Sequence, residues 1–156
     1  LANSGPFPTI FNFDNIELKI VGNGPLLGNL KNKYNNSNIK FLGEKTNEEV
    51  LTLISESMAV VTATKLYEGQ PMLLCEASSV GVPSMFPRTG GVSEYFPKDY
   101  KLSFNQFDYD DLKKKLELIK KHELIVETGK ENLDFISSYL NKQKLLDQFQ
   151  RVSDEG

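Results

Sequence analysis

Residues 58–86 read MAVVTATKLYEGQPMLLCEASSVGVPSMF, and this stretch decides the predicted fold. It begins with a run of apolar and β-branched residues at 58–64, which predicts a strand buried on both faces, as in parallel sheets. Pro71 should occupy the first helical position, because a first turn leaves that amide unpaired in any case. The helix should end near Gly81, and residues 82–86 should form a second strand. A strand, a helix and a strand in this order indicate a parallel α/β unit.

The flanking sequence continues this alternation on both sides. Thr46 and Glu49 form the pattern of a capping box, which marks the start of one further helix. The expected fold class is α/β, with a Rossmann-like parallel sheet that carries helices on both faces and a single domain over residues 1–156. The other predicted strands are 16–21, 38–42 and a short one at 101–104, and the other predicted helices are about 25–34, 46–57, 108–121, 123–138 and 140–151.

The composition is globular and excludes several classes of protein. The formal net charge of -3 gives no basic face for nucleic acid, so we expect no nucleic-acid partner. The one cysteine, Cys75, excludes an internal disulfide framework and suits a reducing compartment. No apolar run approaches the ~20 residues of a membrane-spanning helix, and no signal-peptide pattern is visible. We therefore expect a cytoplasmic protein. Contact of the lysine-rich 108–121 helix with the inner face of a cell membrane is left open as the lesser alternative.

Two carboxylates, Glu68 and Glu76, flank the start of the helix at Pro71. The amides of Met72 and Leu73 should lack intrahelical partners, and with the helix dipole they form an anion site. Glu76 should lie one turn deeper, about 5.4 Å along the axis, where a carboxylate can accept from the hydroxyls of a ribose whose phosphate sits at the helix start. Glu68 would face the group beyond the far phosphate. Such carboxylates alone are usually solvated, so the surrounding sequence has to show whether these two belong to a binding site.

That surrounding sequence resembles a known family in an ordered set of motifs. Residues 68–94 read EGQPMLLCEASSVGVPSMFPRTGGVSE, similar to the signature of family-4 retaining glycosyltransferases of the two-domain GT-B fold: EGxPxxLLEA, small residues, GVPV and xGGxxE. Upstream, LKIVGNGPLLGNLK (18–31) resembles the strand–GxGP–helix of that family, and NIKFLGEKTNEEVLTLISES (38–57) resembles its strand–FLG–helix. The resemblance spans about residues 16–120 and implies the C-terminal, donor-binding half of such an enzyme.

The resemblance implies roles for individual residues. Glu76 would bind the donor ribose, and Glu68, the candidate catalytic residue, would contact the transferred sugar. The amides of Met72 and Leu73 would hold the diphosphate. The further donor-binding positions would be Gly69, Gln70 and Pro71 in the same loop, and Gly43, Lys45 and Thr46 at the nucleobase, mostly through the backbone.

The implied reaction is transfer of a hexose from a nucleoside-diphosphate sugar, with retention of configuration and without a metal or cofactor. The acceptor would be a glycan or a lipid-linked molecule, as in the synthesis of cell-envelope polysaccharide or lipopolysaccharide. We expect an N-terminal domain, absent from this sequence, to bind that acceptor. The fragment alone should then bind the donor without catalysing transfer, and any peripheral membrane contact would belong to the intact protein.

One departure concerns positive charge. The family places an Arg and a Lys against the diphosphate, but residues 1–15 contain neither. Two glutamates beside a diphosphate need such cations, since like charges at short range are costly in a poorly solvated site. We therefore expect the basic pair to precede Leu1. Lys65 and Arg88, near strand ends, could substitute in part, although each alone is typical of a solvated surface cation.

Other interpretations of the sequence stay open or are set aside. The glycines Gly22, Gly24 and Gly28 suggest an NAD-binding domain of an oxidoreductase, although the third is one place late for GxGxxG. A non-catalytic module that kept the fold and binds sugar nucleotides is the other alternative. The DxD at 108–110 is better explained as a helix cap. His122 and Cys75 have no nearby partner for a metal site or a nucleophile.

Overall fold

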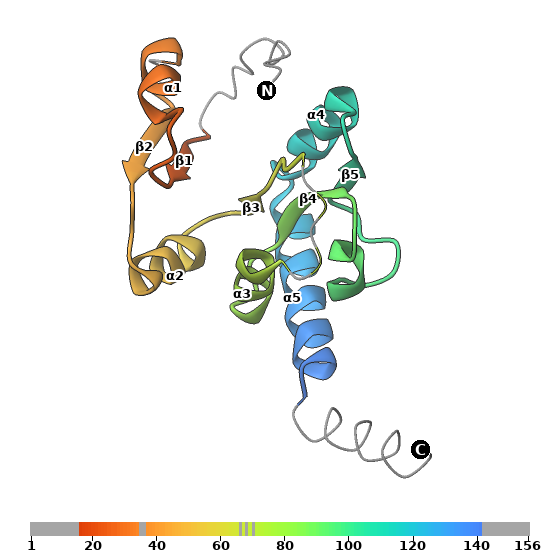
Figure 1. Ribbon diagram of the computed structural model, residues 1–156. Helices are drawn as coiled ribbons and strands as arrows, with labels where there is room; N and C mark the ends of the chain where they lie inside the picture. Colours follow the sequence, from red (N-terminus) through yellow and green to blue (C-terminus); the bar gives the residue numbers. More distant parts are fainter. Residues whose placement is uncertain (1–15, 35–36, 66, 68, 70, 142–156) are drawn as a thin grey trace, which may run out of the picture. The chain divides into compact units, whose positions relative to one another are not determined.

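The structure is a computed structural model that describes residues 16–34, 37–65, 67, 69 and 71–141 (Figure 1). Its contacts divide the chain into two compact units, residues 1–50 and 51–156. The strand pairs of the described residues are all parallel, as the alternation of strands and helices predicts. The described strands form two sheets, one of two strands and one of three. The predicted α/β class with parallel pairing is confirmed.

The first unit contains a strand–helix–strand motif made of β1 (Leu18–Val21), α1 (Leu27–Lys33) and β2 (Ile39–Gly43). The two strands pair in parallel, with Leu18 beside Ile39. After β1 the amide of Gly22 donates to the carbonyl of Gly43 at 2.8 Å. Gly43 has a φ of 71°, in the left-handed region that side chains disfavour. The turn that ends β2 therefore requires glycine.

The capping box predicted at Thr46 and Glu49 is present at the start of α2 (Asn47–Ser55). The Thr46 amide donates to Oε2 of Glu49 at 2.8 Å, and the Glu49 amide donates to Oγ1 of Thr46 at 3.3 Å. Nζ of Lys45 lies 2.8 Å from Oε1 of the same carboxylate. The bond from Lys45, followed by those from Thr46, lowers the pKa of Glu49 to about 2.

The second unit carries the three-stranded sheet, with β4 between β3 and β5. Val60 pairs with Ser84 on one side of β4, and Phe86 pairs with Ser103 on the other. The elements in chain order are β3 (Val60–Val61), α3 (Met72–Ser79), β4 (Ser84–Arg88), the 3-10 helix η1 (Val92–Tyr95), β5 (Ser103–Asn105), α4 (Tyr109–Leu118) and α5 (His122–Tyr139).

The strand predicted at 58–64 is shorter and more exposed than expected. Only Val60 and Val61 pair as a strand, and Val61 is 38% exposed, so burial on both faces is wrong for this stretch. The reason is its position, since β3 pairs with β4 alone among the described strands. By contrast, the first four residues of β4 are all buried.

Aromatic side chains fill the centre of the second unit around β4. The ring of Phe86 lies 4.3 Å from that of Phe96 and stacks on Tyr100 at 5.4 Å. The hydroxyl of Tyr100 accepts hydrogen bonds from the Ser84 amide and from Nδ2 of Asn132, both at 3.0 Å. This phenol therefore ties β4 to α5, and burial raises its pKa to about 12.

Helices α3 and α5 pack side by side (Figure 1). Gly129 of α5 lies against the turn after α3, because a Cβ built there would clash with the carbonyl oxygen of Gly81. Glycine at 129 thus sets how closely α5 approaches the turn after α3. Of the described helices, none is long and apolar enough to cross a membrane. The helix predicted at 140–151 lies almost wholly outside the described residues.

Candidate functional site

Helix α3 follows the loop that leaves the carboxyl end of β3, and parallel sheets bind ligands at the carboxyl ends of their strands. Pro71 is the N-cap, with a ψ of 86°, so the predicted first helical position is wrong by one residue. Its carbonyl accepts from the amides of Leu74 at 3.1 Å and Cys75 at 3.0 Å. A non-helical ψ at a residue whose carbonyl accepts the first bonds of the helix identifies that residue as the N-cap. The amides of Met72 and Leu73 therefore come before the first hydrogen-bonded amide, as expected.

The start of α3 combines an anchored side with an open side. Pro71 is buried and Leu74 is 1% exposed, whereas Met72 is 68% exposed and Leu73 39% exposed. The first turn holds no acidic residue, so no carboxylate within it offsets the positive end of the dipole. This end of α3 can therefore meet an anion from solvent.

Glu76 lies in α3, four residues after Met72, and is partly exposed. That spacing places it on the same side of the helix, one turn further along. The other carboxylate, Glu68, and its neighbour Gln70 lie outside the described residues. Of the predicted loop, the structure thus describes Gly69, Pro71 and the helix, but not Glu68.

The carbonyl of Gly69 lies against a second glycine loop. A Cβ built on Gly91 would stand 3.0 Å from the oxygen of Gly69 and 3.7 Å from its Cα. This loop follows β4, so the same sheet edge carries both glycines. The pairing of Gly69 with Gly91 is a feature that we did not predict from the sequence. The consecutive glycines at 90 and 91 were the one signal that could have indicated it.

Arg88, considered above as a substitute cation, has structural partners. Its guanidinium donates to the carbonyl of Ser103 at 3.3 Å, to Oγ of Ser103 at 3.2 Å and to Oδ1 of Asn105. It also lies 3.7 Å from Oδ2 of Asp111. Arg88 thus joins the end of β4 to β5 and α4, and its donors point to protein groups.

The residues expected at the nucleobase belong to the first unit. The Thr46 amide and the Lys45 side chain both bond to Glu49, so they stabilise the start of α2. The carbonyl of Gly43 accepts from Gly22. Use of these residues together with Glu76 stays a prediction.

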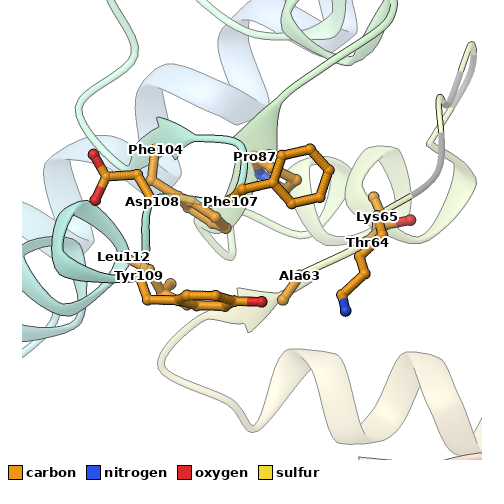
Figure 2. A pocket seen from close by; sticks show the side chains of 9 residues that line it. All are labelled: Ala63, Thr64, Lys65, Pro87, Phe104, Phe107, Asp108, Tyr109 and Leu112. Atoms are coloured by element: carbon orange, nitrogen blue, oxygen red, sulfur yellow. The ribbon is translucent and has the colours of Figure 1, made fainter. Parts of the chain in front are cut away.

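A shallow hollow lies at the carboxyl ends of β3, β4 and β5 (Figure 2). It encloses about 270 Å³ of empty space, part of which is open solvent. Figure 2 shows aromatic rings around it and the Asp108 carboxylate turned away from it. The lining is mainly apolar, which suits the face of a ring or an apolar chain rather than a phosphate. The lining residues are Ala63, Thr64, Lys65, Pro87, Phe104, Phe107, Asp108, Tyr109 and Leu112.

The remaining candidates have local explanations. Oδ1 of Asp108 accepts from the Asp111 amide at 2.9 Å, so the DxD segment caps α4, as predicted. Cys75 is partly buried, and this burial, followed by the charge of Glu76, raises the pKa of its thiol. A raised pKa disfavours the nucleophilic thiolate. His122 is the exposed first residue of α5. Within the described residues, no group of three His, Cys, Asp or Glu side chains could hold a metal ion.

Several solved structures share this fold. Sucrose-phosphate synthase from Thermosynechococcus elongatus matches with a TM-score of 0.74 at 18% identity, over 89% of this chain and 38% of its own. TarM of S. aureus matches with a TM-score of 0.73 at 20% identity, over 88% of this chain and 29% of its own. HepE of Anabaena, in complex with UDP and glucose, matches with a TM-score of 0.71 at 13% identity, over 90% of this chain and 41% of its own. The chain thus spans less than half of the length of each. The shared fold is that of the C-terminal domains of GT-B glycosyltransferases.

Sequence comparison identifies the family. No curated protein sequence matches the chain. The family model of the glycosyl transferases group 1 matches residues 7–137, which is most of the chain. The match includes the helix start at Pro71, Glu76 and the loop with Gly91. The chain therefore belongs to the glycosyl transferases group 1.

Proposed function

We propose that this chain binds a nucleoside-diphosphate hexose at the start of α3 and serves retaining transfer of that hexose, without a metal. The observation that carries the proposal is the geometry of α3. Its cap residue, Pro71, ends the loop that leaves the carboxyl end of β3, its first two amides come before the hydrogen-bonded turn, and Glu76 follows one turn later. A diphosphate at the amides and a ribose at the carboxylate match this order of groups.

Each predicted residue has a role in this proposal. The amides of Met72 and Leu73 hold the diphosphate and stabilise it as the leaving group. Glu76 accepts from the ribose hydroxyls. Glu68 contacts the transferred hexose, with Gly69, Gln70 and Pro71 shaping its loop. Gly43, Lys45 and Thr46 contact the nucleobase. These contacts to the base are made mostly through the backbone, and the Thr46 amide already donates to Glu49.

The proposal also requires cations from elsewhere in the intact protein. Arg88 is held by Ser103, Asn105 and Asp111, which leaves it poorly placed to neutralise a diphosphate. The dipole of an exposed helix contributes only about 0.3–1 kcal/mol, or up to ~2 kcal/mol in a partly buried site. We therefore expect the chain to bind nucleotide sugars weakly, with affinity that falls as salt rises. The basic pair of the intact enzyme would strengthen binding.

The intact enzyme would combine this donor half with a separate acceptor domain. The chain spans 29% to 41% of the solved structures that it resembles, which supports this division. HepE has been solved with UDP and glucose, and TarM with UDP and α-GlcNAc-glycerol. By analogy at the level of the family, we propose a glycan or lipid-linked acceptor in cell-envelope polysaccharide or lipopolysaccharide synthesis. The enzyme would work in the cytoplasm, at the inner face of the membrane where a lipid carries the acceptor.

A thermal-shift panel tests the proposed donor class. The panel contains UDP-glucose, GDP-mannose and ADP-glucose, with NAD as the comparison for the oxidoreductase alternative. A ligand at ten times its Kd stabilises by about 1.4 kcal/mol, which shifts the Tm of a domain of this size by roughly 3–6 °C. We expect such a shift with at least one nucleotide sugar and none with NAD. A shift with NAD alone would instead favour dinucleotide binding at the Gly22–Gly28 loop.

Activity of the intact protein separates the enzyme from a non-catalytic module. Transfer from the best nucleotide sugar, with retention at the anomeric carbon, is the expected result. Donor binding without hydrolysis or transfer to any supplied glycan or lipid-linked acceptor would favour the module.

A further inference from the structure

Four buried polar side chains belong to the three elements that pack around the centre of the second unit. They are Ser78 in α3, Ser84 in β4, and Thr128 and Asn132 in α5, each at most 1% exposed. Each has one side-chain oxygen that makes no hydrogen bond to any group of the described residues: Oγ in the serines, Oγ1 in the threonine and Oδ1 in the asparagine. Buried polar atoms in folded proteins nearly always have a partner, either protein or ordered water. Four such oxygens therefore indicate a bound group.

Three of the four side chains lie close to one phenol. The Tyr100 oxygen accepts from the Ser84 amide and from Nδ2 of Asn132, both at 3.0 Å, so these two residues share one partner. Thr128 precedes Asn132 by four residues in α5. That spacing places both side chains on the same side of the helix, one turn apart. The free oxygens of β4 and α5 therefore belong to one contact between the strand and the helix.

Ser78 reaches the same contact through the turn that follows α3. Its carbonyl accepts from the Gly81 amide at 3.1 Å, and the Gly81 carbonyl lies against Gly129, the residue after Thr128. A Cβ built on Gly129 would also lie 3.4 Å from Cδ of Pro83, the residue before β4. The end of α3, the start of β4 and the middle of α5 thus meet here. We call this place the α3–β4–α5 junction.

The chemistry of the four oxygens fits a water molecule. The three hydroxyl groups can each donate and accept, whereas Oδ1 of Asn132 can only accept. A water that accepts from two hydroxyls can donate to the third hydroxyl and to Oδ1, so one molecule can serve all four groups. Internal waters of globular proteins typically make about three hydrogen bonds of this kind. All four oxygens are neutral, which disfavours a metal ion or another charged ligand.

We propose that the α3–β4–α5 junction binds an ordered internal water molecule through Ser78, Ser84, Thr128 and Asn132. This water joins α3, the helix that carries Glu76, to α5 and to β4. It is a structural part of the second unit and is bound in the absence of any other ligand. The inference goes beyond the proposed function and does not depend on it.

Thr128→Val distinguishes a hydrated junction from a dry one. Valine keeps the shape of the threonine side chain and removes its hydroxyl group. If that hydroxyl binds the water, its loss leaves the water short of a partner, and the Tm should fall by roughly 3–6 °C. If the hydroxyl is unpaired, its loss removes a buried polar group without a partner, and the Tm should stay the same or rise.

Ser78→Ala is the second variant, and Ser137→Ala is its matched control. Both serines lie within helices, so alanine changes helix propensity alike in the two variants, but Ser137 is exposed. The Tm of Ser78→Ala should lie roughly 3–6 °C below that of the control. A crystal structure of the wild-type chain should show a water within hydrogen-bond distance of at least three of the four oxygens. A junction without that water, or a Tm that stays or rises in Thr128→Val, overturns the proposal.

Discussion

Removing one hydroxyl, with Tyr100→Phe, should destabilise the second unit by about 2–4 kcal/mol. The Tyr100 side chain is 8% exposed, and its oxygen accepts from the Ser84 amide and from Nδ2 of Asn132, both at 3.0 Å. Phenylalanine keeps the ring contacts but leaves both donors without this acceptor. A buried polar group that loses its partner costs about 1–3 kcal/mol, and two such groups give the expected range after partial relaxation.

The assay is chemical unfolding followed by far-UV circular dichroism at neutral pH. The matched control is Tyr95→Phe, because Tyr95 is only partly buried in η1 and its ring packs edge-on against Tyr139 at 5.4 Å. The control should change the free energy of unfolding by less than about 0.5 kcal/mol. Equal effects of the two substitutions would show that the Tyr100 hydroxyl does not join β4 to α5.

The same hydroxyl predicts a loss of stability at alkaline pH. Burial raises the pKa of Tyr100 to about 12, whereas a tyrosine in the unfolded chain titrates near 10. The unfolded state therefore loses its proton first as the pH rises. This contribution to stability is complete below pH 10 and decreases as the pH rises through 12. The total loss of stability is about 2–3 kcal/mol. Tyr100→Phe should lack this loss, so the difference in stability between wild type and variant should shrink between pH 10 and 12.

Two further predictions concern helix packing and capping. Gly129→Ala places a Cβ against the carbonyl oxygen of Gly81, so it should destabilise the protein by about 1–3 kcal/mol. Gly28→Ala has open space around it and should be neutral or gain up to about 1 kcal/mol from helix propensity. Thermal unfolding of both variants checks this prediction, and equal shifts of Tm would contradict it. The pKa of Glu49, lowered from 4.5 to about 2 chiefly by Lys45, means that the cap of α2 gains stability above pH 4.5 and loses it as pH falls toward 2. A carboxyl NMR titration measures this pKa directly, and Lys45→Met should raise it; a titration near 4.5 in the wild type would refute the cap geometry.

The sequence predicted local structure well because capping and turn chemistry are local. Thr46 with Glu49 and Asp108 with Asp111 are pairs three residues apart, and both form the hydrogen bonds of a helix cap, as capping at these two helix starts was predicted. Parallel pairing followed from the alternation of strands with helices. The division of the strands into two sheets could not be predicted, because alternation does not say which non-consecutive strands become neighbours. For the same reason, the burial of the apolar run at 58–64 on both faces was wrongly predicted, because the burial of a strand depends on its neighbours.

The candidate site shows a similar division between local and distant features. The start of α3 was located to within one residue, since Pro71 and the spacing to Glu76 are properties of the sequence. Long-range contacts were missed. The approach of Gly91 to Gly69 joins residues 22 positions apart, and the partners of Arg88 lie 15 to 17 residues away in the hydrogen bonds that it makes. Such contacts depend on how β4 lies beside β5 and η1, which no local pattern encodes.

The most direct test of the account is calorimetry on Glu76→Ala with two ligands, the best nucleotide sugar of the panel and inorganic pyrophosphate. Hydrogen bonds to a charged group contribute about 1.5–3 kcal/mol, so loss of the carboxylate should weaken the nucleotide sugar at least roughly tenfold. Pyrophosphate has no ribose, and its affinity should be unchanged or slightly improved by the loss of a nearby negative charge. Glu76→Gln keeps the shape of the side chain and one acceptor oxygen. Its affinity for the nucleotide sugar should lie between those of the wild type and Glu76→Ala. An equal loss for both ligands would contradict the account, because Glu76 would then shape the helix rather than hold the ribose.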